Sequence, residues 1–591
     1  MEQKLIAPVS MPIPSGMKTE FTIQNGKLKM EGKNGYIEVL NAIPYIHYQE
    51  VRVINNEPVY ALVGEIVADS GKKIPFRMPY EFIKNAYDYF WKLAIQNGVL
   101  LTGELTRNDA NDKLLKFIAE VVNYKVKTEQ LPTQFVFCTM GFHLHNGTLL
   151  YAQDGGIPPV PGVRYETGHA FQFNETLNLH DLFIGLTTMS ADTEANAAIL
   201  LFKVLGLLQS FFHLAGLPPV NFMLCICGPS NSGKTYCATA VFSNHIVNGS
   251  KTQSSFSDTE KGMILLTRET HPVMLFDDLT VGSSVKALDT LSRMYASGIG
   301  RNTSNSNQEL VRGVPPQGLG AVTMEFVPKN LTGSALTRLF VVEVSPMSFA
   351  KTADAPNVSG YAAGLLDRPD IVGTFDTVFT NYICKNPDKA KSVFAAAYNG
   401  APMLLDGLVH TPRYVTSFSF LVAALMLLVE FGKECCGLTE NEAQATYNLY
   451  LDALTSLTLK NEKRKAAFEI VGSYLSALLH SINNQTLKLA DSREQFNANY
   501  SSYDGYWHND KYNMEIKMDR VHYVTTSYLL QNGVSLPASQ GSINSQIWQK
   551  YPNILQKYND RYSHRITVSK EPEIKIQTMT INHKELQCVV D

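Results

Sequence analysis

The chain has 591 residues, of which 45% are apolar and 18% are charged, and its formal net charge is −3. This composition is ordinary for a folded protein, and the length predicts about three or four domains. The near-neutral charge excludes the strongly basic overall surface that many nucleic-acid-binding proteins have, so any DNA-binding charge must be local.

Targeting and redox signals are weak. The eight cysteines lack the CxxC spacing of a zinc site, so we expect free thiols in a reducing compartment. Residues 1–16 contain no continuous apolar segment of the kind found in signal peptides. Two very apolar stretches, 197–212 and 418–431, are interrupted or too short for a membrane span, so they predict buried helices. We therefore expect a soluble, cytoplasmic protein with no membrane partner.

The N-terminal quarter, 1–125, is predicted to be an α+β domain. Strand-like runs occur at 49–54, 59–66 and 73–77, and helical patterns follow at 82–96 and 112–122. A strand-rich connector is predicted over 126–180. In it Asn146-Gly147 indicates a hairpin turn, and the Pro/Gly-rich residues 155–162 indicate an exposed loop.

From 181 to 455 helical patterns alternate with short apolar runs, which is typical of an α/β domain built on a sheet. A helical segment and linker are predicted over 456–514. Within it, the basic run 460–465 favours a solvated helix face, and the Asn-rich piece 497–513 a linker or surface loop. Over 515–591, helical patterns at 518–531 and 543–558 precede strands at 565–569 and 574–582, which resembles a winged helix.

A phosphate-binding loop is the clearest motif. An apolar run at 222–227 leads into a Gly-rich turn, and a helical pattern follows at 236–242. Backbone N–H groups converge on phosphates in such a turn, and the helix N-terminus adds positive potential. Lys234 is predicted to reach the β- and γ-phosphates of ATP, and Thr235 to bind Mg²⁺. The predicted nucleotide-binding residues are Gly228, Pro229, Ser230, Asn231, Ser232, Gly233, Lys234 and Thr235.

A second buried run, 272–276, ends in Asp277-Asp278. The distance from Lys234 leaves room for a helix and one further strand, for which 253–257 is the candidate. Asp277 is predicted to hold the metal through its water shell, and Asp278 to polarise the attacking water. Most P-loop motors have Glu at the second position, and the Asp side chain is one methylene shorter. The alternative is that the pair is a loop acid or a helix cap.

A third strand is predicted over 320–327 and carries polar residues in an apolar run. A buried polar group needs a partner, so Thr323 and Glu325 are candidates for a sensor of the lytic water, with Asn330 possible just beyond. Two arginines follow. Arg338 precedes a strand at 339–344, and Arg413 opens an apolar helix at 414–431, where its charge opposes the helix dipole and indicates an anionic partner. The alternative for each position is a purely structural role.

These motifs resemble AAA+ helicases of the minichromosome-maintenance (MCM) type. The resemblance is carried by the loop 228–235, the acidic strand 273–278 and the segment 336–342. A fuller match is to mobile-element ATPases, through Gly141-Phe142, the segment 295–301 and Thr323-Met-Glu325. Among these, the chain is most similar to the cassette chromosome helicases of staphylococcal resistance elements. The motif resemblance spans about residues 135–435, and the flanks match in architecture.

The resemblance implies an AAA+ core in a homohexameric ring that hydrolyses ATP and threads single-stranded or forked DNA with 3′→5′ polarity. Lys234, Thr235 and Asp277 match ATP and metal ligands, Asp278 the catalytic acid, and Arg338 an arginine finger acting on the neighbouring subunit. Arg413 resembles a second sensor. In such motors the interval after the acidic strand holds a channel hairpin, so Arg301 and Arg312 are candidate DNA-binding residues. A solvated loop is their alternative.

Two functions remain open on the sequence alone. The first is a DNA helicase used in replication of a mobile element. The second is a P-loop switch or remodeller that uses ATP for assembly on DNA or protein without unwinding. A small-molecule kinase is disfavoured because it has no use for an arginine acting between subunits or for large flanking domains.

Overall fold

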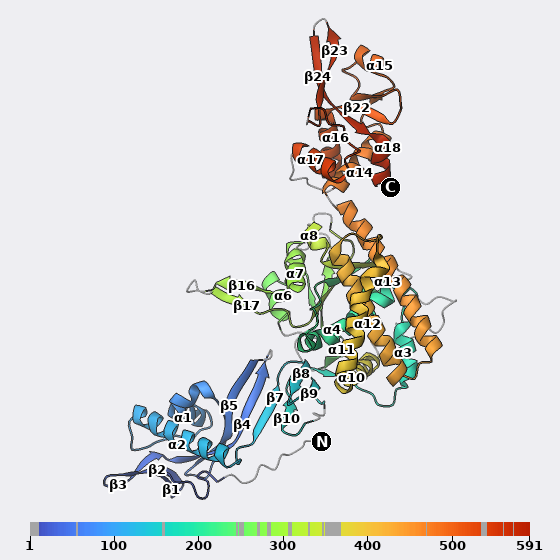
Figure 1. Cartoon of the computed structure of the whole chain (residues 1–591). Helices are drawn as coiled ribbons and strands as arrows, with labels where there is room; N and C mark the ends of the chain where they lie inside the picture. The colour runs from blue at the N-terminus through green and yellow to red at the C-terminus, as the bar shows by residue number, and fades with distance from the viewer. Residues whose placement is uncertain are drawn as a thin grey trace.

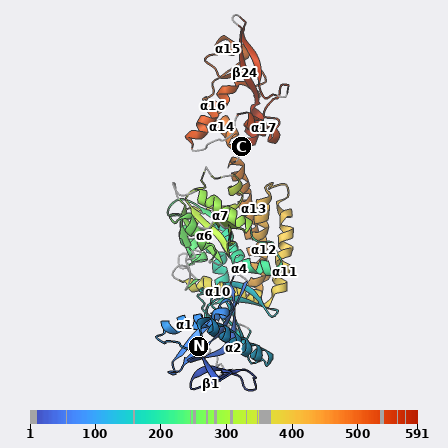
Figure 2. The same ribbon diagram turned by 90° about the vertical axis from the view of Figure 1, so that its left-hand side faces the viewer.

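The structure is a computed structural model. It describes residues 11–54, 57–156, 160–243, 246–247, 253–268, 272–279, 285–304, 310–328, 331, 333–345, 348, 368–468, 470–532, 540–559, 561–570 and 573–590. Three units follow one another along the chain, and Figures 1 and 2 show them stacked along one direction with the C-terminal unit farthest from the N-terminal one.

The N-terminal unit is an α+β fold. A three-stranded sheet, β1-β2-β3, lies beside a five-stranded sheet of order β10-β7-β4-β5-β6. Two helices pack against these sheets: Phe76 of the larger sheet packs on Phe90 of α1, and Phe21 of the smaller sheet packs on Phe117 of α2. The elements are β1 (Phe21–Gln24), β2 (Lys27–Gly32), β3 (Gly35–Leu40), β4 (Ala42–Ile54), β5 (Glu57–Ala68), β6 (Lys73–Pro79), η1 (Tyr80–Asn85), α1 (Ala86–Gln96), α2 (Arg107–Lys127), β7 (Thr133–Phe137) and β10 (Val163–Tyr165).

The predicted strands of this unit and the helix predicted over 112–122 are present with longer bounds, whereas the helix predicted over 82–96 is divided between η1 and α1. Strands β1 to β3 were not predicted. The predicted boundary at residue 125 falls inside α2, and β7 pairs in parallel with β4, so the N-terminal sheet continues into the segment predicted as a connector. The predicted hairpin is present as β8 (Gly141–His145) and β9 (Thr148–Ala152), and both turn residues, Asn146 and Gly147, have positive φ.

The central unit is built on a parallel sheet of order β14-β15-β18-β12-β19, in which every neighbouring pair is parallel. All five residues of β12 are buried, as expected for a strand covered on both faces. The sheet strands are β12 (Met223–Cys227), β14 (Gln253–Ser255), β15 (Val273–Leu279), β18 (Leu319–Met324) and β19 (Leu339–Glu343). β18 ends before its predicted limit, so Glu325 lies just beyond the strand and not within it.

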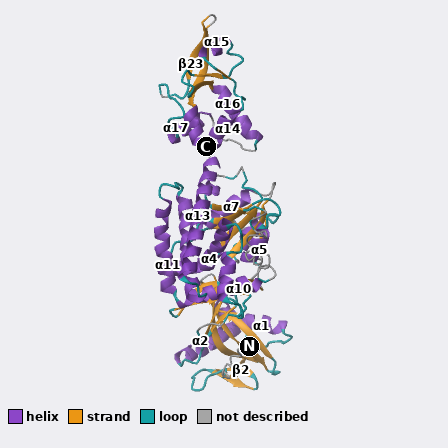
Figure 3. Cartoon of the chain, turned by 90° about the vertical axis from the view of Figure 1, so that its right-hand side faces the viewer, coloured by secondary structure: helices purple, strands orange, loops and turns teal. Residues whose placement is uncertain are grey.

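Helices cover this sheet, and Figure 3 shows α11 and α13 gathered on one side of the unit and the strands on the other. The helices and small strands are α3 (Leu179–Thr187), α4 (Thr193–Ala215), α5 (Lys234–Phe242), α6 (Glu260–Leu266), α7 (Val285–Ser297), α8 (Gly333–Leu336), α10 (Pro369–Lys385), α11 (Pro387–Gly400), η2 (Ala401–Leu405), α12 (Pro412–Cys435), α13 (Glu440–Phe468), β11 (Ala170–Phe171), β13 (Ile246–Val247), β16 (Gly300–Ser304) and β17 (Leu310–Gly313).

The two very apolar stretches are core helices. By length and composition α4 and α12 could cross a membrane, but 78% of the most apolar window of each is buried inside the fold. α4 packs so closely on the sheet that a Cβ on Gly206 would lie 2.6 Å from Val273 Cγ2. Within α4, Lys203 forms an ion pair of 2.6 Å with Asp376 of α10, and both side chains are fully buried.

The basic run 460–465 is not a bare solvated face. It lies in α13, where Lys460 pairs with Glu194 and Arg464 pairs with Glu343 at 2.7 Å each. Between them Asn461 caps the backbone of Val341 with hydrogen bonds of 2.9 Å in both directions. The run therefore fastens α13 to the central sheet. The predicted boundary at residue 455 falls inside this helix.

The C-terminal unit combines helices with a five-stranded sheet of order β20-β21-β22-β24-β23. The predicted linker 497–513 is wrong in part, because it supplies β21 to this sheet. The helix predicted over 543–558 ends at Lys550, and Leu555 then bridges to Ile581 of β24. The elements are α14 (Ile470–Asn483), β20 (Leu489–Ala490), α15 (Arg493–Ala498), β21 (Gly505–Trp507), β22 (Asn513–Lys517), α16 (Met518–Gln531), α17 (Gln540–Lys550), β23 (His564–Lys570), β24 (Glu573–Asn582) and α18 (His583–Val590).

Candidate functional site

The Gly-rich loop lies at the carboxyl end of β12 and leads directly into α5, which begins at Lys234. Ligands of open α/β sheets bind at this edge of the sheet. Gly228 allows a close backbone approach, since a Cβ there would lie 2.3 Å from the Val344 carbonyl oxygen. Asn231 and Gly233 adopt left-handed backbone conformations, with φ of 65° and 80°. Backbone conformations of this kind allow successive N–H groups to form a concave site for an anion.

Two polar side chains of the loop, those of Lys234 and Ser232, are almost fully buried. Lys234 is only 8% exposed, and its ammonium donates to the Pro229 carbonyl at 3.2 Å, which is a contact within the loop itself. Ser232 is 2% exposed, and its hydroxyl has no hydrogen-bond partner within the described residues. A buried hydroxyl without a partner is costly, so an acceptor such as a phosphate oxygen would satisfy it.

Asp277 is the centre of a hydrogen-bond network at the end of β15. Its Oδ1 accepts from the hydroxyl of Thr235 at 2.9 Å and from the hydroxyl of Thr323. Its Oδ2 accepts from the Gln253 amide at 3.5 Å. The loop helix and strands β14, β15 and β18 thus converge on one carboxylate. A carboxylate beside hydroxyl oxygens is the donor set that Mg²⁺ prefers, so these residues fit that ion.

Asp278 differs from its neighbour in conformation and exposure. It has φ of 64° at a register shift between β15 and β18, and its residue is exposed where Asp277 is half-buried. Its backbone N–H donates to the Thr323 hydroxyl at 3.0 Å. Thr323, which is fully buried, therefore donates to Asp277 and accepts from Asp278, and so sets the position of both acids.

The three sensor candidates fall in different places. Thr323 lies on β18, between the strands of the loop and of the acids, and contacts both acids. Glu325 lies beyond the strand end and accepts from the hydroxyl of Ser230 in the loop. Asn330 lies outside the described residues. The geometry thus connects Thr323 to the acids and Glu325 to the phosphate loop.

The two arginines, Arg338 and Arg413, lie at the opposite edge of the sheet, where the amino ends of the strands are. Arg338 immediately precedes β19, which runs parallel to β12 with Leu339 beside Met223. Cys227, the last residue before the loop, lies beside Glu343, which is five residue steps after Arg338. Arg338 is therefore about 16 Å from the loop along the strand direction. The helix that Arg413 opens packs on the same edge, where the Tyr414 hydroxyl donates to the Leu336 carbonyl at 3.4 Å.

Arg338 and Arg413 share one basic cluster. Burial lowers the pKa of Arg338, the positive charges of Arg413 and Arg293 lower it further, and Asp289 opposes them. The guanidinium of Arg338 donates to the Ser334 carbonyl. An accumulation of like charge at this edge favours an anionic partner that is not the loop of the same chain.

Arg301 and Arg312 lie on the β16–β17 hairpin. Its strands pair antiparallel, with Gly300 opposite Gly313, and Figure 1 shows the hairpin extending away from the body of the central unit. The side chains of both arginines lie outside the described residues.

Sequence reasoning missed three contributors to this site. Gln253 was recognised as a strand residue but not as a partner of Asp277, and Ser230 was not connected with Glu325. Arg293, which is four residues after its ion-pair partner Asp289 on α7, joins the arginine cluster. A polar residue on a short buried strand was the available signal for Gln253, and no sequence signal pointed to Arg293.

For the ATP hydrolysis that the sequence predicts, replacement of Thr323 by Val should lower kcat by about 10- to 100-fold, because Val keeps the shape but removes both hydrogen bonds that position the acids. The Mg²⁺ concentration needed for half-maximal activity should rise as well. Thr323→Ser, which keeps the hydroxyl, should recover most of the activity. Equal Mg²⁺ titrations for the Val variant and the unchanged chain would contradict this role.

No protein-family model matches the chain, and no curated protein matches it in sequence. A solved structure described as “SCCmec type IV Cch - active helicase” is similar in fold. The two share 13% sequence identity at a TM-score of 0.55, over 97% of this chain and 99% of that one. At this identity the likeness concerns the fold, and it extends through all three units.

Proposed function

We propose that this chain is an ATP-dependent DNA helicase or translocase with an AAA+ P-loop core, which acts as a homohexameric ring on single-stranded or forked DNA. The observation that carries the proposal is the convergence of Lys234, Thr235, Asp277 and Thr323 at one sheet edge, with Arg338 and Arg413 at the other. Fold likeness to a helicase over almost the whole chain supports it. The 3′→5′ polarity and a role in mobile-element replication rest on the same resemblance.

Each site residue then has a distinct task. Lys234, Ser232 and the loop N–H groups bind the triphosphate, while Thr235 and Asp277 hold Mg²⁺, which when bound neutralises charge developing on the phosphates. Asp278, whose carboxyl is exposed beside this centre, orients the attacking water and accepts its proton. Thr323 is a positioning residue for both acids, and Glu325 holds the loop through Ser230.

The distance between the two edges of the sheet supports a ring. Arg338 and Arg413 are too far from the phosphate loop of their own chain to contact a γ-phosphate there. Placed against the loop of a neighbouring copy, they would supply positive charge to its transition state. Such an interface is heterologous, and heterologous contacts that close generate rings.

Mixing two inactive variants tests the shared site. Arg338→Ala and Lys234→Ala should each abolish most ATP hydrolysis, whereas an equimolar mixture should recover activity at about a quarter of the interfaces, since only those pair an intact loop with an intact arginine. The control is a mixture of Lys460→Ala, which keeps both halves of the site, with Lys234→Ala. Its activity should fall only in proportion to the share of Lys234→Ala. A mixture that stays inactive while both variants assemble would refute the shared site.

The flanking units complete the proposal. The five segments 1–125, 126–180, 181–455, 456–514 and 515–591 are retained as functional divisions, although the observed elements cross several of their boundaries. Arg301 and Arg312 are proposed to contact DNA phosphates from the β16–β17 hairpin. The C-terminal helices with the β23–β24 ribbon are proposed to act as a winged-helix-like module.

One observation favours the second function, an ATPase switch without unwinding. Asp278 is shorter than the expected Glu and lies in a left-handed conformation at a bulge, which suits slow hydrolysis. Strand displacement on a fork with a 3′ tail separates the two functions. ATP hydrolysis that ignores single-stranded DNA, with no displacement, would favour the switch. The variant Asp278→Glu should then report whether side-chain length limits the rate.

A further inference from the structure

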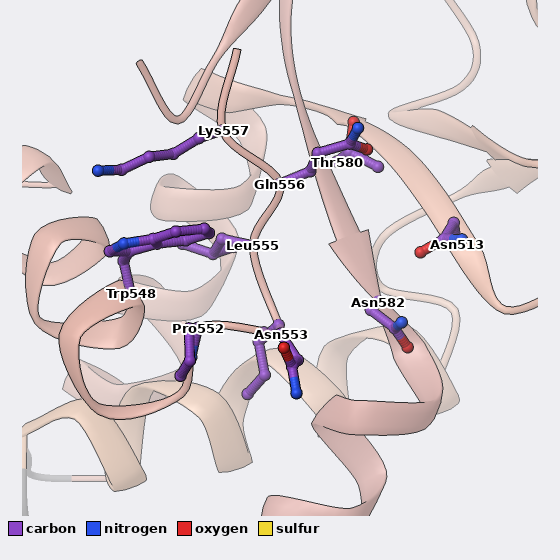
Figure 4. A pocket seen from close by; sticks show the side chains of 10 residues that line it. Asn513, Trp548, Pro552, Asn553, Leu555, Gln556, Lys557, Thr580 and Asn582 are labelled. Atoms are coloured by element: carbon purple, nitrogen blue, oxygen red, sulfur yellow. The ribbon is translucent and has the colours of Figure 1, made fainter. Parts of the chain in front are cut away.

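A cavity of about 390 Å³ lies in the C-terminal unit, remote from the residues assigned above. One wall is the half-buried indole of Trp548 on α17, and Figure 4 shows the Lys557 side chain extended above this ring. Asn513, Asn582 and Thr580 come from the paired strands β22 and β24. The segment carrying Asn553 and Gln556 forms the remaining wall.

The walls are held by backbone pairing. Gln556 N–H donates to the Thr580 carbonyl at 3.2 Å, and Asn582 N–H donates to the Ile554 carbonyl at 2.8 Å. Asn513 lies directly opposite Asn582 in the register of β22 and β24. The amide side chains therefore project from a fixed framework, which keeps the ordering cost of binding low.

The chemistry of the cavity is amide, aromatic and cationic. Among the described residues that line the cavity there is no carboxylate, and Lys557 is the one charged side chain. The Asn553 amide forms no side-chain hydrogen bond within the part of the chain that the structure describes. Side-chain amides offer both a donor and an acceptor, which matches the mixed edges of a nucleobase, and an indole face stacks on bases.

Lys557 is already placed between aromatic rings. Its ammonium lies 4.9 Å from the centre of the Trp548 ring and 5.3 Å from that of Tyr562. A base that stacks on the indole would take the position of the lysine side chain and free the ammonium for the adjoining phosphate. Exchange of a cation–π contact for a charge-assisted phosphate contact costs little.

Other exposed positions of the C-terminal unit repeat this pattern. Tyr512, which precedes Asn513 and is 57% exposed, has the Lys584 ammonium 5.6 Å from its ring centre. Arg520 lies 5.6 Å from the ring of Tyr523, which is also exposed. Outside this unit, the one cation–π contact among the described residues is the buried Lys203–Phe171 contact. Aromatic rings interleaved with cations along one unit fit a strand of several nucleotides.

We propose that this cavity accepts one unstacked base of single-stranded DNA, with Trp548 stacking on it, the amides contacting its edge and Lys557 binding the adjoining phosphate. The inference rests on the proposed DNA-motor function. It assigns to the C-terminal unit a contact with single-stranded DNA that is separate from the ATP site of the central unit.

Binding of a fluorescein-labelled 20-nucleotide single strand to the full chain tests the proposal. Trp548→Ala should weaken binding about tenfold, as expected for loss of one base stack, whereas Trp548→Phe should retain most of the affinity. Lys557→Ala should lower the slope of log Kd against log salt by about one. Trp91→Ala, which removes an exposed indole of the N-terminal unit, is the matched control and should bind normally.

Fluorescence locates the contact independently of truncation. The chain has three tryptophans, so the Trp91→Phe/Trp507→Phe double variant reports on Trp548 alone. Its emission should be quenched by the single strand and not by dAMP at equal nucleotide concentration, because a free nucleotide lacks the neighbouring contacts. If dAMP quenches the emission and the single strand does not, the cavity binds a free nucleotide and not a DNA strand, which would overturn the proposal.

The remaining outcomes separate this inference from the proposed function. If the unchanged chain binds the strand while Trp548→Ala, Lys557→Ala and Trp91→Ala bind equally well, the cavity is not a DNA site, although the motor proposal stands. If the unchanged chain binds no single-stranded DNA, both fail.

Discussion

Replacement of Lys234 by Ala should lower ATP hydrolysis by about 10²–10³-fold, the usual cost of removing a preorganised donor from the charge that develops in a transition state. Lys234 is almost buried, and among the described residues the one hydrogen bond of its ammonium is to the loop carbonyl of Pro229. Its replacement by Ala therefore removes the positive charge from this point of the loop. The measurement is steady-state phosphate release at saturating ATP and Mg²⁺.

Its control is Lys261→Ala, which removes an exposed lysine from α6 in the same unit and should leave the rate unchanged. The Lys234 variant should keep the thermal unfolding curve of the unchanged chain, since the helix can begin with Ala equally well. Normal hydrolysis in a folded Lys234→Ala variant would remove the basis of every nucleotide role proposed for this sheet edge.

Replacement of Lys203 by Ala should destabilise the central unit by about 3–5 kcal/mol, because it leaves the Asp376 carboxylate buried without its counter-charge. The pair is fully buried between α4 and α10, at 2.6 Å, and burial lowers the pKa of Lys203 while Asp376 opposes that shift. Urea unfolding followed by circular dichroism should show an earlier transition for the central unit.

Two comparisons separate charge burial from packing. Lys203→Met with Asp376→Leu should recover most of the stability, since a buried ion pair is often replaceable by apolar groups of similar volume. Lys460→Ala, which removes a largely exposed partner from Glu194, should cost less than about 1 kcal/mol. A Lys203 variant as stable as the Lys460 variant would show that this pair contributes little.

Local sequence patterns correctly predicted the elements that are specified by apolar periodicity and by turn residues. The Gly-rich turn between an apolar run and a helical pattern correctly predicted a strand followed by a helix at 223–242, and Asn146-Gly147 correctly predicted its hairpin. The apolar stretches around Lys203 and Phe418 were interpreted correctly as core helices. In each case a short-range rule, such as a positive φ or a continuous apolar surface, leaves few alternative structures.

Elements that depend on distant partners were predicted poorly. The Asn-rich piece 497–513 looked like a linker because polar composition does not show that β21 pairs with β22. The helix predicted through 558 ends at Lys550 because the following residues pair with β24. Residues 125, 455 and 514, where the sequence predicted boundaries, lie within α2, α13 and β22. Non-local pairing and packing override local preference at such positions.

The sequence by itself determined the chemical identities at this site: a lysine and a threonine after a Gly-rich turn, two acids after a buried strand, and arginines before a strand and at the head of a helix. Only the tertiary structure decided their relations. Parallel pairing brought Thr323 against both acids and Gln253 against Asp277, and it put Arg338 at the far edge of the sheet. The packing of α12 on that edge brought Arg413 beside it. Strand order is set by contacts between residues far apart in the chain, and no local spacing encodes it.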